Sequence, residues 1–279
     1  MSVIETQTWL NTFVKACKEQ QSREPYFIQC ETLCGPLEDW FPKISAEELH
    51  YHLLEQGLFE PEEWKEIATT VQKMGKNNAW RLVNQEYKRL KKKWNGPEAP
   101  IFIYPIKNAR LSASKNRIKK NGVTVMGAIF LFLSPDLVKE EIKAIFAHEY
   151  NHVCRLAYLN VENEKLTLKD SLIIEGLGEF AVKELYGEKW LAPWAHLYSF
   201  EEIVGLWKRH FVPSLTTMGK EKHDLFLYGN NRQLPKWIGY YIGFQIVDSY
   251  QMLHGPFKNN ELYAKTSEEL IAGSKFPYK

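Results

Sequence analysis

The sequence predicts an α+β protein, in which a small sheet is combined with many helices. Apolar residues recur at the three- and four-residue spacing of helices through residues 1–95 and again beyond residue 134. Between these regions, apolar runs of strand length stand at 101–104 and 128–133. The helix breaker Asn95-Gly96-Pro97 precedes the strands, so we predict a helical N-terminal region over 1–95 and a second domain over 96–279.

The composition is that of a folded globular protein. Hydrophobic residues make up 44% and aromatic residues 14% of 279 residues, which is enough for a substantial core. The formal net charge, 36 − 34 = +2, is too small to indicate a nucleic-acid partner, so we expect none. No stretch approaches the roughly 20 apolar residues of a membrane span, and we therefore expect no membrane span either.

The cysteines and the N-terminus indicate a cytoplasmic location. The polar N-terminal residues lack the apolar run of a signal peptide. The spacing of the cysteines fits no disulfide framework, so we interpret them as reduced thiols. They are Cys17, Cys30, Cys34 and Cys154.

The elements of the N-terminal region are predicted from caps and apolar faces. Residues 9–17 carry one apolar face of a first helix. Ser45 resembles the start of a capping box, and Pro61 is placed to open a further helix. A last helix is predicted from about Asn77 to Trp94. Its basic end, residues 88–93, is interpreted as a solvated helix terminus rather than a phosphate-binding patch, because cations favour the negative pole of the helix dipole.

The strands follow directly. Residues 101–104, 123–125 and 128–133 are rich in the β-branched, aromatic and other apolar residues typical of strands. The polar, basic segment 107–122 is predicted as a loop or a hairpin. The unbroken apolar run 128–133 favours a strand buried on both faces.

The spacing His148-Glu149-x-x-His152 organises the second domain. Ser134-Pro135-Asp136 resembles a helix start, and the apolar spacing that follows predicts a helix of about six turns around the motif. On a helix, residues four apart share a face, so the two imidazoles can converge on one tetrahedral zinc ion. Glu149 is then close enough to a metal-bound water to act as a general base. The alternative is an amphipathic helix whose histidines are merely polar neighbours.

A second helix is predicted to complete the metal site. It runs from Asp170 or Ser171 to about Tyr186 and carries Glu175 and Glu179 on one face. Two carboxylates on an otherwise apolar helix are costly unless each has a partner. We predict Glu175 as the third zinc ligand and Glu179 as the acceptor of the spare N–H of a ligating histidine. The alternative is that one or both simply face water.

These motifs carry a resemblance to known families. The pattern from His148 to His152, followed by Glu175-Gly-Leu-Gly-Glu179, resembles the gluzincin metallopeptidases, in which a glutamate on a second helix completes the zinc site. The stretches HEYNHVCRL, DSLIIEGLGEFAV and LPKWIGYYIGFQIV resemble the bacterial YjaZ-like family of predicted zinc-dependent proteases, a domain-of-unknown-function family. The resemblance covers roughly residues 100–260. It implies a gluzincin-like metallopeptidase core of a small sheet plus zinc-binding helices, and a peptide or protein substrate.

The third stretch predicts a helix opened by Pro235. Gly239 and Gly243 lie on one face of this helix and permit close approach of another backbone. Tyr240 lies beside that face, where its hydroxyl can stabilise an oxyanion, and it matches the tyrosine of this segment in the resembled family. Tyr241 is the obvious rival, and a structural aromatic is an equal alternative.

Two further roles are left open. His223 and Arg232 lie near this segment and are candidates for contact with a substrate carboxylate or an oxyanion. By resemblance, the segment 126–133 can hold a peptide backbone by strand addition, and the alternative is a buried core strand.

The sequence therefore predicts a zinc-dependent peptide hydrolase with one zinc ion per chain. Glu149 is its general base and Tyr240 its oxyanion donor. The alternative from another class is a non-catalytic zinc-containing binding module that keeps the protease fold. An intact Glu149 favours the enzyme, because zinc binding alone does not need that residue.

Overall fold

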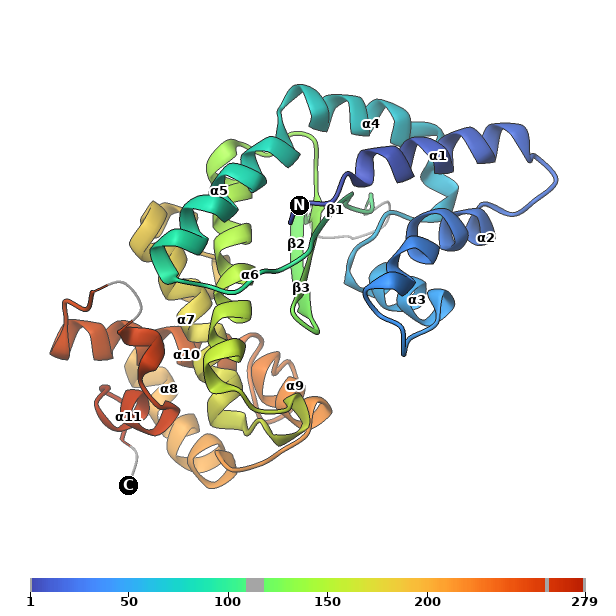
Figure 1. The fold of residues 1–279 in the computed structure, drawn as a ribbon. Helices are drawn as coiled ribbons and strands as arrows, with labels where there is room; N and C mark the ends of the chain where they lie inside the picture. The colour runs from blue at the N-terminus through green and yellow to red at the C-terminus, as the bar shows by residue number, and fades with distance from the viewer. Residues whose placement is uncertain (1, 109–117, 259–260, 278–279) are drawn as a thin grey trace. The chain divides into compact units, whose positions relative to one another are not determined.

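The protein is an α+β protein, as the sequence predicts (Figure 1). The structure is a computed structural model that describes residues 2–108, 118–258 and 261–277. The chain divides into two compact units. The first unit comprises Met1–Lys88 with Glu98–Phe146, and the second comprises Arg89–Pro97 with Ala147–Lys279. The predicted boundary between 1–95 and 96–279 separates two domains that would fold independently. The division into compact units does not test this, so the boundary stays a prediction.

The N-terminal region is helical, as predicted. Ser45 caps α3, because its hydroxyl accepts a hydrogen bond from the backbone N–H of Glu48 at 3.2 Å. Pro61–Glu63 forms a short 3-10 turn that leads into α4. The predicted face of α1 is buried at Phe13 and Val14, and a fully buried large apolar side chain contributes about 1.5–3 kcal/mol. The helices here are α1 (Thr6–Glu19), α2 (Pro25–Gln29), α3 (Ala46–Gln56), α4 (Trp64–Lys76) and α5 (Ala79–Trp94).

The first unit contains a three-stranded sheet in the order β1-β3-β2. The strands are β1 (Ile101–Pro105), β2 (Lys120–Val125) and β3 (Ala128–Leu133). The central strand β3 runs parallel to β1 and antiparallel to β2. Met126 and Gly127 both have positive φ, the conformation of a tight turn between β2 and β3. Of the expected loop or hairpin at 107–122, residues 109–117 lie outside the described residues, and β2 already begins at Lys120.

The prediction that the segment 126–133 binds a peptide by strand addition is wrong. Both edges of β3 are already paired within the sheet, so its backbone groups are not free to bind an added strand. Every residue of β3 is buried, which confirms the alternative of a core strand. Ring stacking of Phe130 on Phe102, with centroids 4.9 Å apart, joins β3 to β1 on one face.

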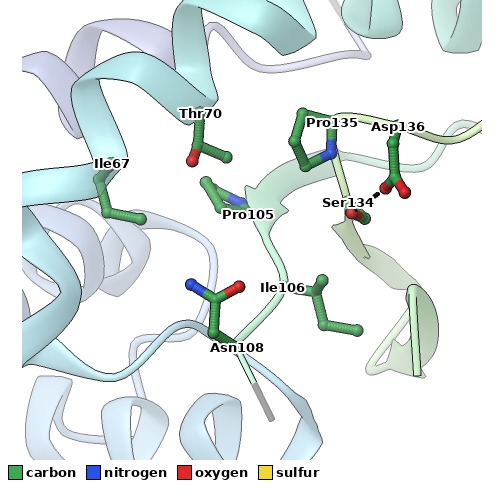
Figure 2. A pocket seen from close by; sticks show the side chains of 8 residues that line it. All are labelled: Ile67, Thr70, Pro105, Ile106, Asn108, Ser134, Pro135 and Asp136. Atoms are coloured by element: carbon green, nitrogen blue, oxygen red, sulfur yellow. Dashed lines mark hydrogen bonds between the residues drawn. The ribbon is translucent and has the colours of Figure 1, made fainter. Parts of the chain in front are cut away.

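A small cavity lies in the first unit (Figure 2). Its volume is about 120 Å³, and it lies between α4 and the segments that follow β1 and β3. Thr70, Asn108 and Asp136 supply polar groups to its wall. Its lining contains no histidine or cysteine, so it differs in chemistry from the centre described below.

The motif helix α6 (Lys139–Leu159) begins later than predicted. Ser134-Pro135-Asp136 is a turn instead of a helix start. The Ser134 hydroxyl donates to the Asp136 carboxylate, and that carboxylate also lies 2.9 Å from the Lys119 ammonium. These local bonds use the groups that would have capped a helix, so α6 begins only where the side chain of Glu141 accepts the backbone N–H of Val138.

The helices α7 and α10 also begin at other residues than predicted. Thr167 caps α7, and Asp170, the expected cap, bonds back to the Thr167 backbone N–H as the third residue of a capping box. Gly187 ends α7 as predicted. Pro235 does not open α10, because Trp237 has a positive φ of 62° and helical geometry starts after it. The remaining helices are α7 (Leu168–Tyr186), α8 (Phe200–Leu206), α9 (Lys220–Leu227), α10 (Ile238–His254) and α11 (Ser267–Ala272).

Glycines bring α7 and α10 into backbone contact. A Cβ at Gly176 would collide with the carbonyl of Gly243, and a Cβ at Gly243 would collide with the carbonyl of Leu172. The close approach predicted at Gly243 is therefore confirmed. Gly239 approaches a different helix, since a Cβ there would lie 2.6 Å from the Cα of Leu227 at the end of α9.

The four cysteines are free and buried. Burial raises the pKa of the Cys17 thiol to about 11 and that of the Cys154 thiol to about 12, so both are held in the unreactive protonated form. Within the described residues, we find no helix with both the length and the apolar character that crossing a membrane requires. The cytoplasmic location stays a prediction.

Candidate metal centre

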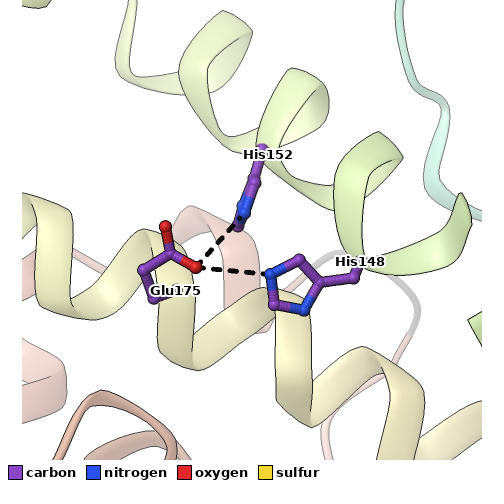
Figure 3. A group of neighbouring side chains, drawn as sticks. All are labelled: His148, His152 and Glu175. Atoms are coloured by element: carbon purple, nitrogen blue, oxygen red, sulfur yellow. Dashed lines mark hydrogen bonds and ion pairs between the residues drawn. The ribbon is translucent and has the colours of Figure 1, made fainter. Parts of the chain in front are cut away.

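The second half of α6 and the middle of α7 bring two histidines and a glutamate together (Figure 3). His148 and His152 are one turn apart on α6, so both rings leave the same face. Nε2 of His148 lies 3.3 Å from Oε2 of Glu175 on α7, and Nε2 of His152 lies 3.4 Å from the same oxygen. Ligand atoms of the three residues all lie within 4.8 Å of one another.

These distances fit a tetrahedral metal ion. Zinc binds histidine nitrogen and carboxylate oxygen at about 2.0–2.2 Å, and two ligands of a tetrahedron with such bonds lie about 3.3–3.5 Å apart. The two nitrogen-to-oxygen distances of 3.3 Å and 3.4 Å match this spacing. The donor set of two imidazoles and one carboxylate also leaves a fourth position for water, which a catalytic zinc site requires.

The centre is nearly buried, and its charges are strongly coupled. His148 and His152 are only 9% and 8% exposed. Burial lowers the pKa of His148, but bonds to Glu175 and Glu179 outweigh it and hold the pKa well above the usual value. Burial alone would raise the pKa of Glu175, yet the adjacent histidines, His152 first, lower it to about 2. The centre therefore stabilises positive charge between the rings and the carboxylate, and a divalent ion would supply that charge.

Glu179 contacts the other side of His148. Its Oε2 lies 3.1 Å from Nδ1 of His148, and its Oε1 accepts the backbone N–H of Ala192. The side chain is buried, so the expected alternative of a solvent-facing Glu179 does not fit this structure. A carboxylate on Nδ1 fixes that nitrogen as an N–H donor, so Nε2, which faces Glu175, is the nitrogen that would bind a metal ion.

Gly178 is a residue of the site that the sequence interpretation missed. A Cβ at this position would lie 2.9 Å from Cε1 of His152 and 3.1 Å from Cε1 of His148. Glycine therefore allows both rings to lie directly against α7. The signal was present in the sequence, because a glycine inside a helix costs about 1 kcal/mol relative to alanine and needs a reason.

The two histidines differ in how they are oriented. Nδ1 of His148 is bonded to Glu179, whereas the buried Nδ1 of His152 has no hydrogen-bond partner within the described ranges. His152 is therefore held by packing against Gly178 and by its contact with Glu175. We expect the position of its ring to be the less tightly fixed of the two.

Glu149 and Tyr240 belong to the same neighbourhood. Glu149 is buried and follows His148 directly on α6. Burial first, and then the charge of Glu175, raise the pKa of the Tyr240 phenol well above its usual value, and the charge of Glu149 adds to the effect. The phenol of Tyr240 is thus within electrostatic reach of both carboxylates, and it stays protonated as a hydrogen-bond donor.

The rival candidates for the oxyanion lie in other surroundings. Tyr241 packs edge-on against Tyr198, with centroids 5.5 Å apart. Burial raises its pKa, and the carboxylates that add to the shift belong to α8 and not to the metal centre. His223 is buried, with its ring nitrogens 2.9 Å from the Ser171 hydroxyl and 2.8 Å from the Thr217 carbonyl. Arg232 is exposed.

Tyr228 is the second residue that the sequence interpretation missed. It lies at the end of α9, with its ring centroid 5.5 Å from that of Tyr240. Its pKa is raised by burial, and the charge of Glu175 adds to this shift. No residue spacing could have found it, because α9 and α10 meet only in the folded chain.

The chain belongs to the DUF2268 family of predicted Zn-dependent proteases, whose profile matches residues 79–272. This confirms the family predicted from the motifs, and the matched range includes α6, α7 and α10 with every residue of the centre. The chain is 36% identical to the uncharacterized protein YjaZ of Bacillus subtilis (strain 168) over 202 residues, which are 71% of this chain and 76% of that protein.

A second relative is more distant. The uncharacterized protein YjfC of the same organism is 25% identical over 174 residues, which are 57% of this chain and 56% of that protein. No solved structure matches the chain. The family description thus names a zinc-dependent protease, and the names of both relatives leave the activity open.

Proposed function

We propose that the chain is a zinc-dependent peptide hydrolase of the gluzincin type, holding one zinc ion through His148, His152 and Glu175. The observation that carries the proposal is the convergence of three ligand atoms within 4.8 Å of one another, with both nitrogen-to-oxygen distances at the spacing of a tetrahedral site. The family description supports the choice of zinc and of a protease activity. The Glu175 carboxylate lies against both rings, whereas the Glu179 carboxylate meets His148 at Nδ1 and its other oxygen accepts the Ala192 N–H.

The proposed chemistry follows from the donors around the centre. Zinc bound there would lower the pKa of a water molecule and polarise the scissile carbonyl. Glu149 takes the proton of the attacking water and later delivers it to the leaving amine. Tyr240, whose pKa is too high for it to ionise near neutral pH, donates its hydroxyl hydrogen bond to the carbonyl oxygen as negative charge develops there.

In the proposed mechanism, Glu179 positions the ring of His148. Its bond to Nδ1 keeps the His148 ring in one tautomer and one orientation, with Nε2 available to the metal. The same carboxylate holds the backbone of Ala192, so the segment that follows α7 is anchored to the centre.

The experiment measures metal content and hydrolysis together. The purified protein should contain about one zinc per chain, and it should cleave members of a peptide library unless a chelator is present. Glu149→Gln should keep the zinc and the fold but lose at least ~100-fold in rate, because glutamine matches glutamate in shape and cannot take a proton.

A matched control lies on the same helix. Glu140 is exposed at the start of α6, so Glu140→Gln should leave the rate unchanged. Normal hydrolysis by Glu149→Gln would rule out this base. Zinc binding by a wild type that cleaves nothing in the library would favour the alternative of a non-catalytic binding module.

A further inference from the structure

Three aromatic side chains gather around Tyr240. Its ring centroid lies 5.2 Å from Trp194, 5.5 Å from Tyr228 and 5.2 Å from Trp237. Tyr228 and Trp237 are also 5.2 Å apart, edge to face. We call these four residues the aromatic cluster. Its members come from three separate segments, the turn Pro193–His196, the end of α9 and the start of α10.

The aromatic cluster lies within the electrostatic reach of the metal centre and is joined to it along the chain. The charges of Glu175 and Glu149 act on the phenol of Tyr240, and the charge of Glu175 also acts on Tyr228. Trp194 follows two residues after Ala192, whose backbone N–H is held by Glu179. A peptide bound at the centre therefore lies within reach of these rings.

The aromatic cluster is not closed off as a core. Tyr228 is 43% exposed, and Trp194, Trp237 and Tyr240 are each only half-buried. Large aromatic rings that remain in contact with water retain apolar area that a ligand can cover, and such rings beside a few polar groups are typical of ligand sites. The rings meet at tilted and edge-on angles between 48° and 76° instead of stacking flat.

The backbone at Trp237 is held in an unfavourable conformation. Its φ of 62° lies in the left-handed region, which glycine or asparagine adopts readily and a bulky residue rarely does. The Trp237 N–H donates to the Tyr228 carbonyl at 2.6 Å, which holds the turn in place. Strain of this kind persists where the surrounding structure enforces it and is concentrated at functional sites. The fold thus holds an indole in a backbone conformation that glycine or asparagine would adopt with less strain.

We propose that the aromatic cluster binds a bulky, uncharged apolar side chain, above all an aromatic one, of the peptide held at the metal centre. The inference deepens the proposed function and rests on it for the position of the peptide. A cationic side chain is disfavoured, because the Lys236 ammonium already lies over the Trp237 ring at 5.6 Å from its centroid.

The test compares binding of three dipeptide hydroxamates to the zinc-loaded protein by calorimetry. The probes share one backbone and differ in a single side chain, which is benzyl, methyl or aminobutyl. The benzyl probe should bind at least ~10-fold more tightly than the methyl probe, since apolar pockets discriminate between side chains of different size by roughly this factor or more. Trp194→Ala and Trp237→Asn should each reduce the preference to about threefold or less.

Two controls separate recognition from structure. Trp190 also follows α7 but lies outside the aromatic cluster, with the Lys189 ammonium 4.9 Å from its ring centroid, so Trp190→Ala should keep the full preference. Trp237→Asn places a residue suited to positive φ, so its midpoint of thermal unfolding should stay within about 4 °C of the wild type. A loss of preference without a loss of stability is the result that a merely structural role cannot give.

Each outcome decides the inference. Equal affinities for benzyl and methyl, tighter binding of the aminobutyl probe, an unchanged preference in both cluster variants, or no binding of any probe would overturn it. Glu149→Gln should show the same preference as the wild type. A protein that prefers the benzyl probe and yet hydrolyses no peptide would contradict the proposed function and leave the aromatic site standing.

Discussion

Two buried histidines, one in each unit, have pKa values that are shifted in opposite directions. His50 of the first unit is fully buried, and burial lowers its pKa from 6.5 to about 4. His148 of the second unit is nearly as buried, and its pKa is held well above 6.5. The difference lies in the partners. Nε2 of His50 is 2.7 Å from the neutral amide oxygen of Gln29, whereas His148 contacts the carboxylates Glu175 and Glu179.

The comparison shows which buried histidine indicates a metal centre. Gln29 donates its amide N–H to the Phe59 carbonyl, so its oxygen faces His50 and accepts the N–H of a neutral ring. That pair carries no net charge that an ion would have to balance, although the buried Nδ1 of His50 has no hydrogen-bond partner within the described residues. Around His148 the carboxylates supply negative charge that a neutral ring cannot balance, so the site favours a cation. Burial alone therefore does not distinguish a structural histidine from a candidate metal ligand. The charge of the hydrogen-bond partners does.

The largest expected effect is the difference in zinc content between a variant without His148 and a variant without His50. His148→Ala should abolish stoichiometric zinc binding, because a three-ligand site loses a ligand. His50→Ala should leave zinc content at the wild-type level. Metal analysis of the two purified variants after dialysis measures this difference directly. Full metal occupancy in His148→Ala would show that the metal binds elsewhere.

The next effect distinguishes the two carboxylates. Glu175→Gln should impair zinc binding severely, whereas Glu179→Gln should weaken metal affinity or activity by ~10–100-fold, the typical effect of a group that orients a ligand. A competition titration with a chelator ranks the variants. If Glu179→Gln were the more damaging, the roles of the two residues would be exchanged. Wild-type values in that variant would remove Glu179 from the site.

A smaller effect is expected at Gly178. Gly178→Ala should gain helix stability, since alanine is favoured by about 1 kcal/mol in a helix. It should also lose roughly 10-fold in zinc affinity, because the new methyl group displaces the rings of His148 and His152. Gly205→Ala in α8 is the control, since its Cβ meets open space. Unfolding curves and zinc titrations of both variants are required, and a Gly178→Ala variant with full affinity would refute the steric role.

The smallest effect concerns His50 and pH. Its folded pKa of about 4 lies below the unfolded value, so the unfolded chain takes up the proton first as the pH falls. Stability is fully present above pH 6.5 and is lost between pH 6.5 and 4. From pH 6.5 to 5.5 the wild type should lose about 1 kcal/mol more than His50→Gln. Urea unfolding at both pH values measures this, and parallel behaviour of the two proteins would contradict the neutral state of His50.

Local spacing predicted the parts of the fold that depend on one helix or strand at a time. The apolar periodicity located α1, α6 and α7, and the spacing of the motif placed His148 and His152 on one face. The contact with Glu175 also followed, because two buried charges on facing helices need one another. These inferences hold because helical geometry is fixed within a few residues.

The parts that failed depend on competition between local bonds or on contacts between distant segments. Ser134 resembles a helix cap, but its hydroxyl donates to Asp136 two residues on. This local bond replaces the capping bond. Pro235 resembles a helix start, but the positive φ of Trp237 delays it. Tyr228 joins the site only through the meeting of α9 and α10, and no pattern within either helix reports that.

The contact between Gly176 and Gly243 sets a distance that matters for chemistry. Gly176 is adjacent to the ligand candidate Glu175, and Gly243 stands one turn after Tyr240. A spacing set by side chains between two helices depends on the rotamers that those side chains adopt. Here backbone meets backbone, so the spacing has no rotamer to change. The two glycines therefore set the separation of the α7 and α10 backbones from which the Glu175 carboxylate and the Tyr240 phenol extend.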